Sequence, residues 1–268
     1  MILAVDAGNT VVRLGCVEGG EVKSVSAMEM RRSRTSDEYA VLMGRILELH
    51  GLAGADFEGA AISSVVPPLT GALREAVRMV TGREALVVGA GVRTGLNIGI
   101  DDPSELGADL VASAVAALEL YGAPAIVVDV GTATTMSVIG PNARLLGGAI
   151  MPGPDVSAEA LYGAASLLPR VPLDAPARCI GRNTVDCMRS GAVFGAAAAI
   201  DGMIERMERE LGGPAKVVAT GALASRIVPH CAREMELDEH MALKGLALIW
   251  KRNQAAPGGR GRARAAGK

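Results

Sequence analysis

The chain has 268 residues, of which 50% are hydrophobic and 21% are charged, and its formal net charge is −2. This length can build one large domain or two smaller ones, each with its own core. The near-neutral charge and the six aromatic residues (one Trp, three Tyr, two Phe) argue against nucleic acid as a partner, because nucleic-acid surfaces are basic and stack bases on aromatic rings.

Composition also limits the cellular context that we expect. The sequence contains no run of about 20 apolar residues, so it predicts no membrane-spanning helix. Asp6 interrupts the first apolar run too early for a signal peptide. The cysteines are scattered without a CxxC pair, and the three histidines are far apart in sequence, which argues against a zinc site or a disulfide framework. We therefore expect a cytoplasmic protein with no membrane partner and with reduced cysteines at positions 16, 179, 187 and 231.

The first half of the chain is predicted to alternate between strands and helices. Strands are expected at residues 2–5, 11–17, 21–26, 60–66 and 85–88, helices at 36–52, 69–81 and 108–121, and a polar loop at 97–105. In the first predicted helix, helical spacing places five residues on one apolar face: Tyr39, Leu42, Met43, Ile46 and Leu49.

The second half begins in the same way as the first. Both halves start with an apolar strand, an Asp-x-Gly turn and a second strand, about 120 residues apart, which indicates an internal duplication. Further strands are expected at 145–151 and 216–220, and helices at 157–164, 184–211 and 243–251. We predict two related α/β lobes at residues 1–115 and 116–253, followed by a disordered basic tail at 254–268.

The two Asp-x-Gly turns are the first candidates for chemistry. A glycine between two strands permits positive φ and lets backbone N–H groups point into a concavity, and Asp6 could hold Mg²⁺ through oxygen. Each turn could also be an ordinary hairpin turn. If they face each other, they could grip a triphosphate from both sides, so we expect Asp6 and Asp129 to converge with Asp109 across the gap.

Two further features have a functional and a structural interpretation. Asp109 lies in the first turn of a predicted helix, where it could be a general base that accepts a hydroxyl proton or an acid that complements the helix dipole. The Thr220-Gly221 turn could approach a nucleotide base or ribose, or it could be an ordinary strand-to-helix connection. Neither a GxxxxGK[ST] loop nor a GxSxG turn occurs in the sequence.

Taken in order, these motifs resemble the type III pantothenate kinase family of the acetate kinase/sugar kinase/Hsp70 superfamily. The resemblance rests on Asp6-Ala7-Gly8-Asn9-Thr10, Ser63-Ser64-Val65-Val66-Pro67-Pro68, Thr94-Gly95-Leu96-Asn97, Gly107-Ala108-Asp109, Asp129-Val130-Gly131-Thr132-Ala133-Thr134-Thr135, Gly147-Gly148-Ala149-Ile150-Met151-Pro152-Gly153, Gly181-Arg182-Asn183-Thr184 and Leu243-Lys244-Gly245-Leu246. It implies an α/β fold of duplicated ribonuclease H-like (actin-like ATPase) lobes with mixed sheets flanked by helices. It also implies a homodimer that phosphorylates pantothenate with ATP, Mg²⁺ and a monovalent cation (K⁺ or NH₄⁺), the first step of coenzyme A biosynthesis.

The resemblance also implies a role for individual residues. Asp109 would accept the hydroxyl proton, and Asp129 would bind the monovalent cation. ATP would contact Asp6, Ala7, Gly8, Asn9, Thr10, Val11, Val12, Arg13 and Thr132. Pantothenate would contact Ile100, Gly107, Ala108, Asp109, Leu110 and Thr184.

Three positions depart from the family pattern. Leu110 stands where the family usually has arginine, Ile100 where it usually has an aromatic residue, and Ala222 where it has glycine. Leucine cannot pair with a carboxylate as arginine does. This leaves three functions open: pantothenate phosphorylation, phosphorylation of a different small alcohol, or nucleotide binding with little or no kinase activity.

Overall fold

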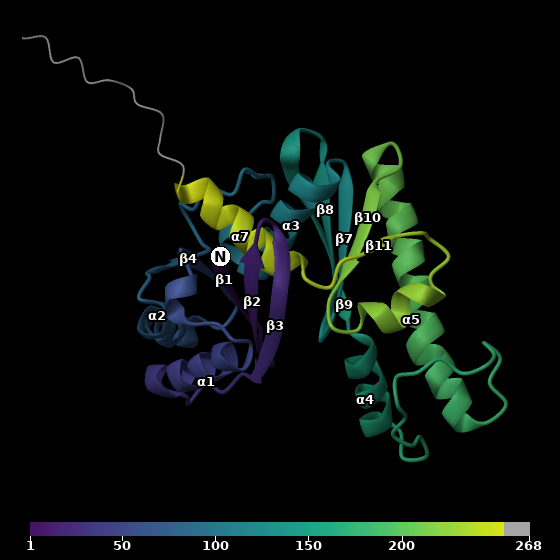
Figure 1. The fold of residues 1–268 in the computed structure, drawn as a ribbon. Coiled ribbons are helices and arrows are strands. Elements are labelled where there is room, and N and C mark those ends of the chain that lie inside the picture. The colour runs from purple at the N-terminus through teal and green to yellow at the C-terminus, as the bar shows by residue number, and fades with distance from the viewer. Residues whose placement is uncertain (255–268) are drawn as a thin grey trace, which may run out of the picture.

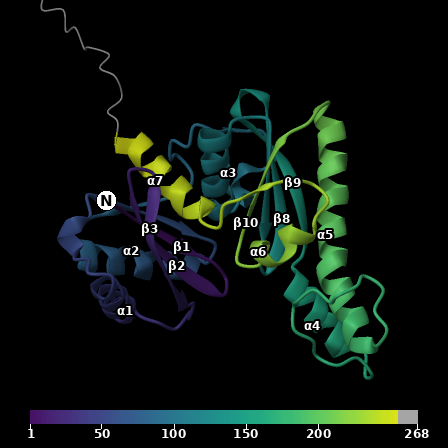
Figure 2. The ribbon, with the colours of Figure 1, turned by 45° about the vertical axis from the view of Figure 1, so that its right-hand side comes forward.

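The computed structural model describes residues 1–254 and contains two mixed β-sheets that lie side by side with helices around them (Figures 1 and 2). The first sheet has the order β3-β2-β1-β4-β5. Its strands are β1 (Ile2–Ala7), β2 (Val11–Glu18), β3 (Glu21–Glu29), β4 (Gly59–Ser64) and β5 (Ala85–Val87). The second sheet has the order β11-β10-β7-β8-β9-β6. It consists of β6 (Asn97–Ile98), β7 (Ala125–Val130), β8 (Ala133–Gly140), β9 (Arg144–Pro152), β10 (Lys216–Thr220) and β11 (Glu236–Leu237).

The two sheets repeat one topology, as the duplicated motif predicts. In each sheet an antiparallel meander, β1-β2-β3 or β7-β8-β9, is extended by a parallel strand, β4 or β10, beside its first strand. The helices are α1 (Ser36–Leu49), α2 (Pro67–Thr81), α3 (Ala108–Tyr121), α4 (Pro154–Ala164), α5 (Thr184–Leu211), α6 (Ala224–Ile227) and α7 (Met241–Gln254). The predicted α/β class with mixed sheets flanked by helices is confirmed.

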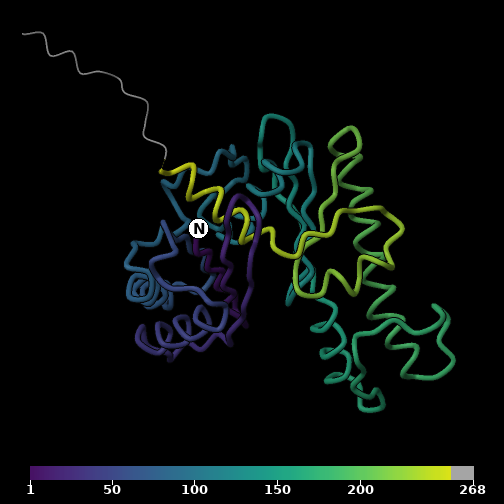
Figure 3. The backbone as a smooth tube through the Cα atoms, in the orientation of Figure 1, coloured from purple at the N-terminus to yellow at the C-terminus, as the bar shows by residue number. Residues whose placement is uncertain are grey.

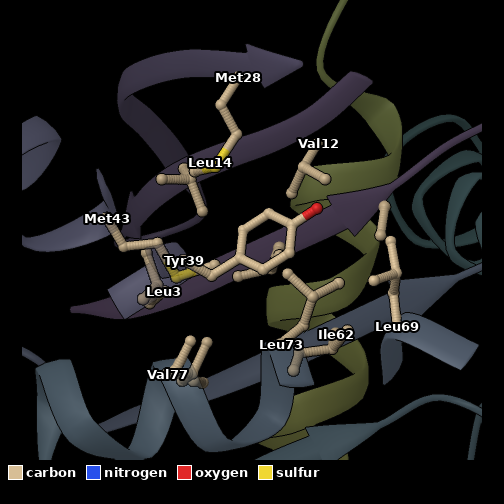
Figure 4. Packing of buried hydrophobic residues seen from close by; sticks show 14 of the residues in the cluster. Leu3, Val12, Leu14, Met28, Tyr39, Met43, Ile62, Leu69, Leu73 and Val77 are labelled. Carbon is tan, nitrogen blue, oxygen red and sulfur yellow. The ribbon is translucent and has the colours of Figure 1, made fainter. Parts of the chain in front are cut away.

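The first core lies between the first sheet and helices α1 and α2, around the fully buried Tyr39 (Figure 4). The predicted inner face of α1 is partly wrong, because the buried positions are Tyr39, Met43 and Leu47 whereas Leu49 is 83% exposed. These three residues are spaced i, i+4, i+8 and form a narrow stripe along the helix. This stripe faces the sheet, whereas the sequence predicted a broader apolar face.

Helix α7 returns from the second half of the chain to the first sheet (Figure 3). Leu243, Leu246 and Ile249 of α7 share a core with Ile2 and Ala4 of β1. Helices α3 and α7 cross closely because Gly245 has no side chain: a Cβ there would lie 1.8 Å from the carbonyl oxygen of Ala112.

The division into lobes at residues 1–115 and 116–253 stays a prediction. Two elements pack with the sheet of the other predicted lobe. Helix α7 packs on the first sheet, and β6, within the predicted polar loop 97–105, pairs with β9 of the second. Gln254 ends α7, and the rest of the predicted basic tail at 254–268 lies outside the described residues. Between residues 1 and 254 the structure contains no helix that is long and apolar enough to cross a membrane.

Candidate active site

The two Asp-x-Gly turns occupy equivalent places, each between the first two strands of an antiparallel meander, β1 and β2 or β7 and β8. The N–H of Gly8 donates to the carbonyl of Val11, and the N–H of Gly131 donates to the carbonyl of Ala133, both at 3.0 Å. These two glycine N–H groups therefore close their own turns, whereas the sequence suggested that such groups would point at a ligand. Asn9, Thr10 and Thr132 lie exposed at the tips of the turns.

Asp6 is buried on the central strand β1 and is contacted from both neighbouring strands. Ser63 of β4 donates a hydrogen bond from its hydroxyl to Oδ1 of Asp6 at 2.7 Å. Nη1 of Arg13, on β2, lies 3.7 Å from Oδ2. Burial raises the pKa of Asp6; the Ser63 hydrogen bond lowers it, the nearby charge of Asp109 raises it, and Arg13 lowers it. The buried negative charge of Asp6 is thus only partly compensated by Arg13.

Asp129 is the penultimate residue of β7, the position that Asp6 has on β1. Burial raises its pKa to about 6, and the negative charges of Asp109 and Asp6 add to this rise, while Arg13 opposes it. Gly221 lies directly against the Asp129 carboxylate: a Cβ on this glycine would lie 2.3 Å from Oδ1 of Asp129, and its φ is +97°. Gly221 therefore leaves room for Asp129, a role that the sequence did not indicate.

Asp109 lies in the first turn of α3, after Gly107 at the N-cap. Its Oδ1 accepts a hydrogen bond from the N–H of Leu110 at 2.8 Å. A Cβ on Gly107 would lie 2.5 Å from the same oxygen, so the carboxylate folds back over the space that the glycine leaves open. The start of α3 thus holds a half-buried carboxylate where the helix dipole favours negative charge.

The three carboxylates lie near enough to one another to interact electrostatically, as the sequence predicts. Asp109 acts electrostatically on both Asp6 and Asp129, and Arg13 acts on the same two residues. Three acidic groups beside one arginine leave a surplus of negative charge in a poorly solvated place, which suits a cation.

Within residues 1–254 no three His, Cys, Asp or Glu side chains are close enough to form a metal cage. Asp6 and Asp129 still fit the cations that the sequence implies. Mg²⁺ in phosphate-transferring sites is commonly held by one or two carboxylates together with water and substrate phosphates.

The other predicted site residues differ in their placement. Ala7 and Val12 belong to the first core, so their side chains cannot contact ATP. Gly8, Val11 and Ala108 are half-buried, as is Leu110. Ile100 is half-buried against β9, with its Cγ2 4.0 Å from the site of a Cβ on Gly147.

Thr184 is not brought to the three carboxylates. It is exposed and begins α5, which packs against α4, α6 and residues 228–230. In both Figure 1 and Figure 2 the start of α5 lies beside α4, away from α3. A cavity of about 310 Å³ opens between β9, α4 and α5, and its lining contains none of the three carboxylates.

Comparisons with known proteins agree with this arrangement. The family whose pattern matches residues 2–206 is that of type III pantothenate kinase. A type III pantothenate kinase of Moorella thermoacetica is 43% identical over 253 residues, which cover 94% of this chain and 100% of that protein.

Solved structures show the same fold at low sequence identity. Component A of (R)-2-hydroxyglutaryl-CoA dehydratase from Acidaminococcus fermentans matches with a TM-score of 0.58 at 15% identity, covering 94% of this chain and 98% of that one. The ethanolamine utilization protein EutJ of Carboxydothermus hydrogenoformans matches with a TM-score of 0.51 at 17% identity, covering 92% and 89%. Together with the match along the sequence, the duplicated fold and its three converging carboxylates lead to one assignment: the chain belongs to the type III pantothenate kinase family.

Proposed function

We propose that this protein transfers the γ-phosphoryl group of ATP to the 4′-hydroxyl of pantothenate, the first step of coenzyme A biosynthesis. The observation that carries the proposal is that Asp6 and Asp129, at equivalent places of a duplicated fold, lie near Asp109 at the start of α3. Family membership supplies the substrates. The site contains carboxylates that could serve as a base and as cation ligands, and turns that could lie along phosphates, which are the parts that phosphoryl transfer needs.

Asp109 is assigned the role of general base. In the reaction the hydroxyl proton passes to the Asp109 carboxylate, the freed oxygen bonds to the γ-phosphorus, and the bond from that phosphorus to the bridging oxygen breaks, releasing ADP. The N–H of Leu110 holds one carboxylate oxygen at 2.8 Å. This contact fixes the direction from which the base receives the proton.

Asp6 and Asp129 are assigned to cations, and the exposed turns to ATP. When bound, Mg²⁺ beside Asp6 would offset negative charge on the transferring phosphoryl group. Asp129 would hold K⁺ or NH₄⁺. This fits a half-buried carboxylate whose register partners on the adjacent strands are the uncharged Thr135 and Thr220. Gly8, Asn9, Thr10, Arg13 and Thr132 would follow the phosphates.

The pantothenate pocket is assigned to Gly107, Ala108, Leu110 and Ile100 of one chain, completed by Thr184 of a second copy in a homodimer. Thr184 lies apart from Asp109 within one chain, so a second copy would be needed to bring it there. Exposed apolar side chains also occur on β9, on α4, on α5 and in the segment between α4 and α5, where six residues are between 41% and 93% exposed: Ile150, Leu161, Tyr162, Leu167, Ile180 and Val185. Sedimentation of the purified protein tests the dimer. We also place the enzyme in the cytoplasm, in keeping with its four free cysteines.

A second candidate follows from positions 100 and 110. Leucine at 110 offers no charge to the pantothenate carboxylate, a loss of roughly 1.5–3 kcal/mol relative to arginine. Phosphorylation of a different small alcohol, or nucleotide binding with little turnover, therefore remains the alternative.

The test is incubation of the purified protein with ATP, Mg²⁺, K⁺ and pantothenate, followed by mass spectrometry. Formation of ADP and 4′-phosphopantothenate in equal amounts supports the proposal. ADP formed with another alcohol from a panel, but not with pantothenate, would favour the alternative kinase. ATP binding by calorimetry without any product would favour the nucleotide-binding alternative.

A further inference from the structure

The buried hydroxyl of Ser63 is directed at a carboxylate that the proposed function assigns to Mg²⁺. Ser63 is fully buried on β4, and in the parallel register it stands directly beside Asp6. Its hydroxyl donates to Oδ1 of Asp6 at 2.7 Å. The family pattern includes this serine, but sequence reasoning gave it no role.

The two carboxylate oxygens of Asp6 have different surroundings. Oδ1 is held by Ser63 from the β4 side, whereas Oδ2 lies 3.7 Å from Arg13 on the β2 side. The Arg13 side chain is 36% exposed, so Oδ2 is the oxygen on the side that a ligand can reach. The hydrogen bond from Ser63 fixes the rotation of the carboxylate and thereby decides which oxygen is presented.

The second lobe has a hydroxyl residue in the same place. Thr220 on β10 pairs with Asp129 in the parallel register, as Ser63 pairs with Asp6. Both residues are buried. A hydroxyl on the parallel neighbour of each acidic strand end is therefore a repeated feature of the fold.

The next residue along β4 has a different task. Ser64 accepts hydrogen bonds from the N–H of Val66 and the hydroxyl of Thr70 at 3.2 and 3.0 Å, and these contacts support the start of α2. Of these two adjacent serines, Ser63 contacts the candidate site, whereas Ser64 contacts only the start of α2. Ser64 is accordingly the matched control for Ser63.

We propose that Ser63 is a positioning residue that orients Asp6 so that Oδ2 faces the Mg²⁺ of bound MgATP. The inference rests on the proposed function for the identity of the nucleotide and the metal. Without the Ser63 hydroxyl, the Asp6 carboxylate would lose the hydrogen bond that fixes its rotation. The cost would then fall on binding that uses the metal, not on the fold or on the pantothenate side.

The experiment compares the full-length wild type with Ser63→Ala, Ser63→Thr and Ser64→Ala. Calorimetry measures the affinity for ATP with Mg²⁺ and for ATP with EDTA, and steady-state assays give kcat, each KM and the Mg²⁺ concentration for half-maximal rate. We expect Ser63→Ala to weaken MgATP binding about 10-fold, the scale of one lost hydrogen bond to a charged group. Its half-maximal Mg²⁺ concentration rises by a similar factor, while metal-free ATP binding and the KM for pantothenate stay near wild type.

Ser63→Thr keeps a hydroxyl and restores most of the lost affinity, and Ser64→Ala binds MgATP as the wild type does. If Ser63→Ala fails to fold, Ser63→Cys fills similar space with a weak donor and gives the same comparison. Equal loss of affinity for MgATP and metal-free ATP, or equal behaviour of Ser63→Ala and Ser64→Ala, would overturn the proposal. So would unchanged MgATP binding by Ser63→Ala, or a wild type that binds no MgATP.

A wild type that binds MgATP but does not phosphorylate pantothenate would refute the proposed function alone. The calorimetric comparison would still decide the role of Ser63.

Discussion

Replacing Asp129 with asparagine should stabilise the cation-free protein at neutral pH. Burial and the neighbouring carboxylates raise the pKa of Asp129 from 3.8 to about 6 in the folded state. A raised folded-state pKa means that this group contributes stability below pH 3.8, and that the contribution is lost as the pH rises through about 6. Asparagine is neutral throughout and does not undergo this loss.

The size of the effect follows from the shift. A rise of about two pKa units corresponds to about 3 kcal/mol at most, since one unit is about 1.4 kcal/mol. At about 2–4 °C per kcal/mol for a chain of this size, Asp129→Asn should gain several degrees in Tm between pH 4 and pH 7.5 relative to the wild type. The same substitution should abolish most kinase activity, because the position would no longer hold a cation.

The assay is urea or thermal unfolding from pH 4 to 8 in EDTA with tetramethylammonium as the only monovalent cation. Asp155→Asn, at an exposed residue in the first turn of α4, serves as the control for the charge change. Adding K⁺ should stabilise the wild type but not Asp129→Asn, because a ligand that binds only the native state adds stability. The difference in stability between the two proteins should therefore become smaller. A stability difference between Asp129→Asn and the wild type that is constant from pH 4 to 8, or that falls as the pH rises, would refute the reasoning.

Three further changes address the proposed general base and the proposed pantothenate pocket. Asp109→Asn should lower kcat by about 10²-fold or more, the scale of lost general-base catalysis, and near-normal turnover in a rapid-quench assay would remove it from that role. Gly107→Ala places a Cβ 2.5 Å from the Asp109 carboxylate. We expect kcat to fall about 10²-fold because the carboxylate is displaced, while Tm stays near wild type. The control Gly71→Ala, in open space on α2, should leave kcat unchanged. Leu110→Arg combined with Ile100→Tyr should raise kcat/KM for pantothenate roughly 10- to 150-fold; an unchanged value would mean that these positions do not face the substrate.

Much of the local structure was predictable because it depends on short-range patterns. The strands flanking the two Asp-x-Gly turns, the helix at α5 and the start of α3 follow from apolar runs and helical spacing. The duplication was predictable as well, because equal patterns form equal supersecondary units. Once both turns are placed at equivalent strand ends, the approach of Asp6 to Asp129 follows from the topology of the repeated lobes.

The tertiary structure decided which groups touch across the chain. The sequence does not contain the register that sets Ser63 beside Asp6, 57 residues away. The return of α7 to the first sheet likewise depends on the close crossing at Gly245.

The roles of the glycines at the candidate site were likewise decided by the tertiary structure. The sequence predicted that backbone N–H groups of the two turns would point into a concavity, and the structure shows that those of Gly8 and Gly131 instead close their own turns. Gly107 and Gly221 instead leave space for the carboxylates of Asp109 and Asp129. Residue type and spacing determined the elements and the acidic strand ends of this protein, whereas only the packing decided how each carboxylate is held, because those contacts join atoms that the chain order does not bring together.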